Sequence, residues 1–152
     1  MADFAMSRAT TINAPADRVH SHLNDFREWQ KWSPWEGLDP DLKRTFTGPE
    51  AGVGSHYAWA GNKKAGQGTM EIIGSTPSKV EIALEFLVPF RASNVTTFEL
   101  IPVGAGGTQV TWHMTGNRGV VMTLMGKLFF DKAIGKDFDK GLAQLKATSE
   151  AR

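Results

Sequence analysis

The residues best suited to binding chemistry in this chain are its aromatic side chains. Of the five tryptophans, Trp29, Trp32 and Trp35 recur every three residues, whereas Trp59 and Trp112 lie in segments with the pattern of strands. Large flat apolar side chains hold aromatic ligands by area burial and offset stacking, and they also fill protein cores. We therefore interpret the three clustered tryptophans mainly as core, keep Trp35 as a cavity candidate, and expect Trp59 or Trp112 to touch a cavity.

The four histidines do not combine into a catalytic or metal-binding motif. His20 and His22 are two residues apart on a predicted helix, about 200° apart around its axis, so they cannot share a metal ion. His113 alternates with Trp112 and should point to solvent, and His56 stands alone. The chain has no cysteine, HExxH motif, paired carboxylates or nucleophile elbow. We predict no metal and no cofactor, and we assign no catalytic residue.

The net charge, the hydropathy and the length of the chain limit which partners and which domain organisation we expect. The 17 basic and 16 acidic residues give a net charge of +1, which provides no strong field for nucleic acid. No signal sequence is recognisable and no window has the ~18 apolar residues of a membrane span, so we expect a cytoplasmic protein. A chain of 152 residues fits a single domain, 1–152, which we expect to be a monomer or a weak homodimer.

The elements that position these residues are mostly strands. From residue 42 onward, short apolar or alternating runs end at glycine, proline or asparagine, which is typical of antiparallel strands. The predicted strands span residues 4–12, 42–47, 55–60, 68–74, 79–88, 93–103 and 108–114.

Helical spacing occurs at two places. Pro15 and the spacing of Val19, Leu23 and Phe26 predict a short helix in two pieces, broken at 24–25. Residues 120–147 predict a long helix with a break near Gly126 and a charged, frayed tail. Strands segregated from helices make the fold α+β, in the order β-α-α-β6-α.

Alternation identifies the residues that should face the long helix. In residues 79–88, Val80, Ile82, Leu84 and Phe86 share one face. With the neighbouring strands and the helix, the cavity candidates are Trp35, Tyr57, Trp59, Ile82, Leu84, Phe86, Val95, Thr97, Val110, Trp112, Met114, Leu128, Gly135 and Phe138. Ser55, Tyr57 and Thr97 supply hydrogen-bonding points. The alternative is a solid core without a usable void, because protein interiors are close-packed.

Several segments, in this order, resemble one known superfamily. They are INAPA at 12–16, WQKWSPW at 29–35, GVGS at 52–55, WAGN at 59–62, TQVTW at 108–112 and IGKDFDKGLAQLK at 134–146. The sequence is similar to the START/Bet v 1-like superfamily, and within it to the polyketide cyclase/dehydrase-type members called SRPBCC proteins. The resemblance covers nearly the whole chain.

This resemblance implies a helix-grip fold, in which a curved antiparallel sheet of about seven strands wraps a long C-terminal helix. It implies a hollow between sheet and helix that holds lipids or aromatic molecules, but no single reaction. We therefore expect a protein that binds or transports a hydrophobic small molecule or lipid. The alternatives are a polyketide cyclase/dehydrase-like enzyme, which would polarise a carbonyl by Tyr57, Thr97 or an arginine, and a chaperone-activator-like interaction module.

Overall fold

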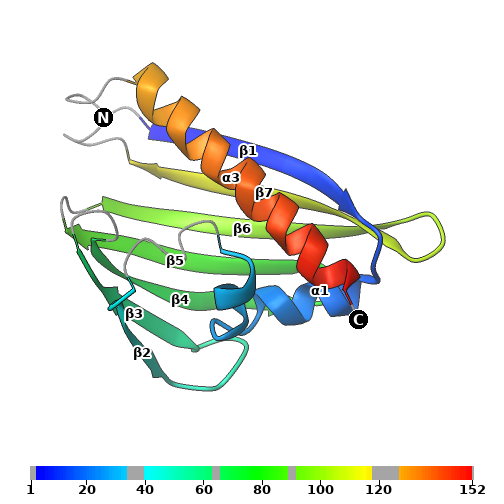
Figure 1. Cartoon of the computed structure of the whole chain (residues 1–152), viewed down its shortest axis with the longest axis horizontal. Coiled ribbons are helices and arrows are strands. Elements are labelled where there is room, and N and C mark those ends of the chain that lie inside the picture. Colours follow the sequence, from blue (N-terminus) through cyan, green and yellow to red (C-terminus); the bar gives the residue numbers. More distant parts are fainter. Residues whose placement is uncertain (1–2, 34–39, 63–65, 89–91, 118–126, 152) are drawn as a thin grey trace.

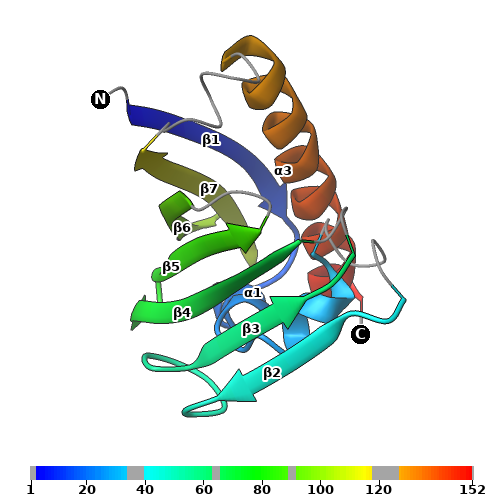
Figure 2. The same ribbon diagram turned by 90° about the vertical axis from the view of Figure 1, so that its left-hand side faces the viewer.

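The computed structural model describes residues 3–33, 40–62, 66–88, 92–117 and 127–151. In these ranges seven strands form one antiparallel sheet in the order β1-β7-β6-β5-β4-β3-β2. The sheet is curved, and the long helix α3 runs obliquely across one of its faces, with α1 packed at one end (Figures 1 and 2). The predicted helix-grip α+β fold is confirmed.

The strands match the predicted segments closely. They are β1 (Asp3–Ile12), β2 (Lys43–Thr47), β3 (His56–Ala60), β4 (Gln67–Thr76), β5 (Lys79–Val88), β6 (Ala92–Val103) and β7 (Gly107–Asn117). Consecutive strands from β2 to β7 pair as a meander, because short turns suffice for antiparallel neighbours. β1 pairs with β7, so the first and the last strand of the chain are neighbours in the sheet.

The first helical segment is split, as predicted at residues 24–25. The helix α1 (Ala16–Leu23) is followed by its C-cap residue Asn24, and a single 3₁₀ turn, η1 (Glu28–Lys31), comes after it. Val19 and Leu23, four residues apart, are fully buried, which orients α1 with one apolar stripe toward the sheet.

The final helix α3 (Lys127–Glu150) continues beyond the predicted end at residue 147. Its tail is not frayed. The carboxylate of Glu150 accepts a hydrogen bond of 2.8 Å from the backbone N–H of Asn13, and the Ser149 carbonyl accepts one of 3.4 Å from Arg18. The C-terminal end of α3 is thus fixed against the junction between β1 and α1, a contact that local sequence does not reveal.

Candidate functional site: the inner face of the sheet

The strand β5 sets which face of the sheet looks toward α3. Val80 and Ile82 are fully buried, Leu84 is 5% exposed, and Phe86 is partly buried against the core. The predicted orientation of this strand is confirmed. The cross-strand pairs of β5 then define the inner face of every neighbouring strand, because paired residues point to the same side.

The orientation predicted for β6 was wrong. Val95 pairs with Ala83 on the outer face and is 38% exposed, and Thr97 lies between Glu81 and His113 on that same face. The inner residues are the even-numbered ones, of which Phe98 and Leu100 are buried apolar side chains and Asn94 and Thr96 are polar. The apolar Val95 suggested the opposite alternation, but burial of Phe98 and Leu100 decides the register.

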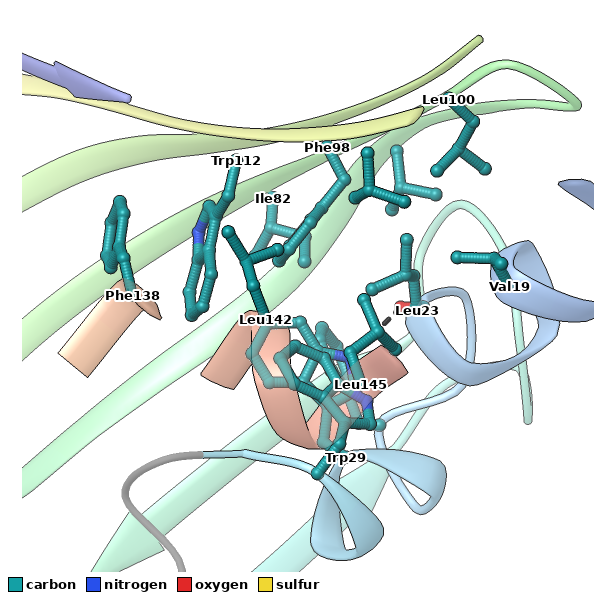
Figure 3. Packing of buried hydrophobic residues seen from close by; sticks show 14 of the residues in the cluster. Val19, Leu23, Trp29, Ile82, Phe98, Leu100, Trp112, Phe138, Leu142 and Leu145 are labelled. Atoms are coloured by element: carbon teal, nitrogen blue, oxygen red, sulfur yellow. Dashed lines mark hydrogen bonds between the residues drawn. The ribbon is translucent and has the colours of Figure 1, made fainter. Parts of the chain in front are cut away.

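One part of the inner face, which we call the packed region, is filled by aromatic rings. It consists of Trp29, Trp32, Phe98, Trp112 and Phe138, none more than 4% exposed. The rings of Trp112 and Phe138 stack with centroids 4.1 Å apart and an interplanar angle of 5° (Figure 3). Trp32 meets both Phe98 and Trp112 edge to face at 5.8 Å. The packed region is filled by side chains in mutual contact and serves as core.

Hydrogen bonds hold Trp29 of η1 and Trp32, the residue directly after η1, in the packed region. Trp29 Nε1 donates to the Leu23 carbonyl at 3.0 Å, and Trp32 Nε1 donates to the His22 carbonyl at 2.9 Å. Gln144 on α3 donates to the Trp32 carbonyl at 2.7 Å. Both indole N–H groups thereby donate to carbonyls at the C-terminal end of α1, which a helix terminus leaves without a backbone partner. The interpretation of these two tryptophans as core is confirmed.

A second part of the inner face, the mixed region, has a different character. It consists of the rings of Tyr57, Trp59 and Phe86 and of two residues of β6: Asn94, in the same cross-strand row as Tyr57, and Thr96, in the next row toward the packed region. Trp59 and Phe86 are only partly buried, and their rings meet edge to face with centroids 6.0 Å apart. Tyr57 stacks on Trp59 at 6.1 Å. Aromatic surface on the inner face of a sheet therefore stays accessible here.

A glycine lets the Trp59 ring lie across the neighbouring strand. Gly68 pairs with Trp59, and a Cβ atom at Gly68 would lie 2.6 Å from Trp59 Cζ2 and 2.5 Å from the Glu85 carbonyl oxygen. Only glycine permits this close approach. The orientation of the indole thus depends on Gly68, whose contact with Trp59 local sequence does not reveal.

The mixed region also contains two buried polar side chains. Asn94 is 8% exposed and Thr96 is 3% exposed. In the part of the chain that the structure describes, Asn94 Oδ1 and Thr96 Oγ1 have no hydrogen-bond partner. Neither residue was among the predicted site residues, since the wrong alternation placed their neighbours inside instead.

Gly135 occupies a different position from the one expected for a cavity residue. A Cβ atom there would lie 2.5 Å from the guanidinium of Arg8, so Arg8 from β1 covers this point of α3. Arg8 Nε lies 3.7 Å from Asp139 Oδ1, which forms an exposed ion pair at the β1 edge of the sheet. Gly135 therefore accommodates an arginine of the same chain.

The remaining cavity candidates fall into two groups. Val110 and Met114 face the inside next to Trp112, at 0% and 3% exposure, as predicted. Trp35 and the side chain of Leu128 lie outside the described residues, although Leu128 belongs to the first turns of α3. Contact of any of these residues with a ligand stays a prediction.

The titratable groups with shifted pKa values lie away from the mixed region. Hydrogen bonds from Lys31 and His22, at 2.9 and 3.0 Å, hold the pKa of Glu28 below its ordinary value. Burial lowers the pKa of His20, although a hydrogen bond with the Thr76 backbone acts the other way. These groups lie at the α1 end of the molecule. His113 points outward as predicted and lies 3.1 Å from Glu99.

The described part of the chain contains neither a candidate metal site nor a membrane-spanning helix. Over the residues that the structure describes, no three histidine, aspartate or glutamate side chains gather where they could hold a metal ion. No helix in the described ranges is long and apolar enough to cross a bilayer.

The fold and the inner face define an α+β protein of the helix-grip class. The chain belongs to the family described as polyketide cyclase / dehydrase and lipid transport, whose profile matches residues 1–150. The predicted family is thereby confirmed. No curated protein matches the sequence significantly.

Solved structures share the fold at low sequence identity. Protein CV1439 from Chromobacterium violaceum has a TM-score of 0.71 and 17% identity, over 97% of this chain and 98% of that one. The hypothetical protein jhp0584 from Helicobacter pylori has a TM-score of 0.72 and 12% identity, over 97% and 88%. The di-domain ARO/CYC BexL from the BE-7585A biosynthetic pathway has a TM-score of 0.69 and 12% identity, over 99% of this chain and 51% of BexL. At these identities the similarity shows the fold alone.

Proposed function

We propose that this protein binds a hydrophobic or aromatic small molecule or lipid between the mixed region of the sheet and α3. The observation that carries the proposal is the accessible aromatic surface of Trp59 and Phe86 on the inner face. Large aromatic rings bury 150–250 Å² each as a rule, so rings left partly exposed on an inward face favour association with an apolar partner.

The residue types on the inner face favour binding over covalent chemistry. By strand pairing, the inner positions of the described strands hold no aspartate, glutamate or histidine. General acid–base catalysis relies mainly on these side chains. The proposed function therefore has no covalent step.

A cyclase- or dehydrase-like activity is the second candidate. Its support is the description of the family and the position of Tyr57, whose phenol lies on the inner face at 8% exposure. Thr97 no longer belongs to this hypothesis, because it lies on the outer face. Faster cyclisation of a candidate polyketide with the protein than without it, lost in Tyr57→Phe, would establish the enzyme.

Native mass spectrometry of the protein purified from its own host tests binding directly. We expect the native mass to exceed the denatured mass by that of a small molecule. The adduct should diminish in Trp59→Ala and persist in the control Val95→Ala, which removes an apolar side chain from the outer face of the same sheet. An empty wild-type protein that also fails to bind a panel of aromatic probes would contradict the proposal.

A further inference from the structure

The buried polar pair in the mixed region is the feature that an apolar binding face does not explain. Asn94 and Thr96 are two residues apart on β6 and therefore point to the same side. Their side-chain oxygens are buried and, among the described residues, without a hydrogen-bond partner. Buried polar atoms in folded proteins are nearly always hydrogen-bonded, so two adjacent exceptions require an explanation.

The surroundings of the pair are apolar and offer no substitute partner. Asn94 pairs with Leu84, and Thr96 pairs with Ile82 on one side and Met114 on the other. All three neighbours are at most 5% exposed. Leucine and valine have the same number and branching of side-chain heavy atoms as asparagine and threonine, so an inner face selected only for stability would contain such apolar residues here.

We propose that Asn94 and Thr96 bind a hydroxyl group on the ligand, an inference that rests on the proposed binding function. An amide oxygen only accepts hydrogen bonds, whereas the threonine hydroxyl donates and accepts. A ligand hydroxyl, which also does both, satisfies the two side chains together. It does so in either orientation of the Asn94 amide. A carboxylate only accepts, so with the amide oriented as in this structure it would leave Asn94 Oδ1 without a donor. The ligand class is therefore an apolar, preferably aromatic, molecule with an uncharged hydroxyl group that reaches β6.

Two probes of nearly equal shape test this assignment. 2-Naphthol carries a hydroxyl where 2-methylnaphthalene carries a methyl group. Their dissociation constants are measured from tryptophan fluorescence on the full chain, in wild type, Thr96→Val, Asn94→Leu and the double variant. The matched control is Thr97→Val, which makes the same change on the outer face of β6.

The expected result concerns the ratio of the two dissociation constants. We expect Asn94→Leu and Thr96→Val together to reduce the preference for 2-naphthol about tenfold, the typical worth of a buried hydrogen bond. Binding of 2-methylnaphthalene should be unchanged or tighter in these variants, and Thr97→Val should keep the wild-type ratio. Without ligand, the two inner-face variants should melt higher by about 2–5 °C, because a buried oxygen without a partner is replaced by a methyl group.

Three contrary outcomes distinguish failure of the hydroxyl assignment from failure of the proposed binding function. If both probes bind to every variant with the wild-type ratio, the hydroxyl assignment is overturned and the binding function stands. If the inner-face variants melt lower and keep the ratio, the pair has a structural role and the assignment is again overturned. If neither probe binds to the wild type, the proposed function fails, and the assignment falls with it.

Discussion

Trp112 and Trp59 lie on the same face of one sheet, and their surroundings show how that face is divided. Trp112 is fully buried in the packed region, stacked on Phe138 from α3. Trp59 is partly buried in the mixed region, stacked on Tyr57 and edge-on to Phe86, both from the sheet itself. The packed region thus joins the sheet to the helix. The mixed region presents aromatic surface and unsatisfied polar atoms, which stability alone does not favour.

The largest expected effect is a loss of stability when a ring of the packed region is removed. We expect Trp112→Ala to lower the free energy of unfolding by about 3–5 kcal/mol, because a buried ring is lost and a cavity remains. Trp59→Ala should cost about 1–2 kcal/mol, since its ring is already partly accessible to water. Urea unfolding followed by circular dichroism measures both variants. Equal losses of stability in the two variants would show that the packed and mixed regions do not differ in how tightly their tryptophans are packed.

An intermediate effect sharpens the description of the mixed region. Gly68→Ala should lower the free energy of unfolding by about 1–3 kcal/mol and shift the Trp59 fluorescence, because the new methyl group would overlap the indole and the Glu85 carbonyl. The control is Gly74→Ala on the same strand, where the nearest atom to a Cβ is the flexible carboxylate of Glu81 at 3.3 Å. If both variants behave alike, the close approach of Trp59 is not what requires glycine.

The smallest effect is the pH dependence contributed by His20. This side chain lies against Ser75 Oγ at 3.3 Å, and burial holds its pKa below the ordinary value of 6.5. The unfolded chain therefore binds more protons as the pH falls below 6.5, so stability decreases toward acid. Because the ring is partly exposed and screened, we expect less than about 1 kcal/mol.

The measurement for His20 compares unfolding of wild type and His20→Asn at pH 7 and at lower pH. The variant should lose less stability than the wild type as the pH falls. Probe binding should be the same function of pH in both proteins, because His20 lies at the α1 end and not in the mixed region. Identical pH profiles of stability would contradict the assignment to His20.

The sequence by itself determined the order of the elements and the orientation of their strongest segments. The alternation of Val80, Ile82, Leu84 and Phe86 predicted the inner face of β5, because a strand buried on one side requires an apolar residue at every second position. Pro15 and the 24–25 break predicted α1 and its end in the same way, from local backbone preferences.

Only the tertiary structure decided which residues of β6 face inward. Residues 94–97 read Asn-Val-Thr-Thr, where the apolar Val95 indicates one register and the buried Phe98 and Leu100 require the other. Local pattern cannot resolve this conflict, because the register follows from pairing with β5 and β7 along the whole strand. The contacts of Gly68 with Trp59, and of Gly135 with Arg8, are equally invisible to local sequence, since each joins residues brought together only by folding.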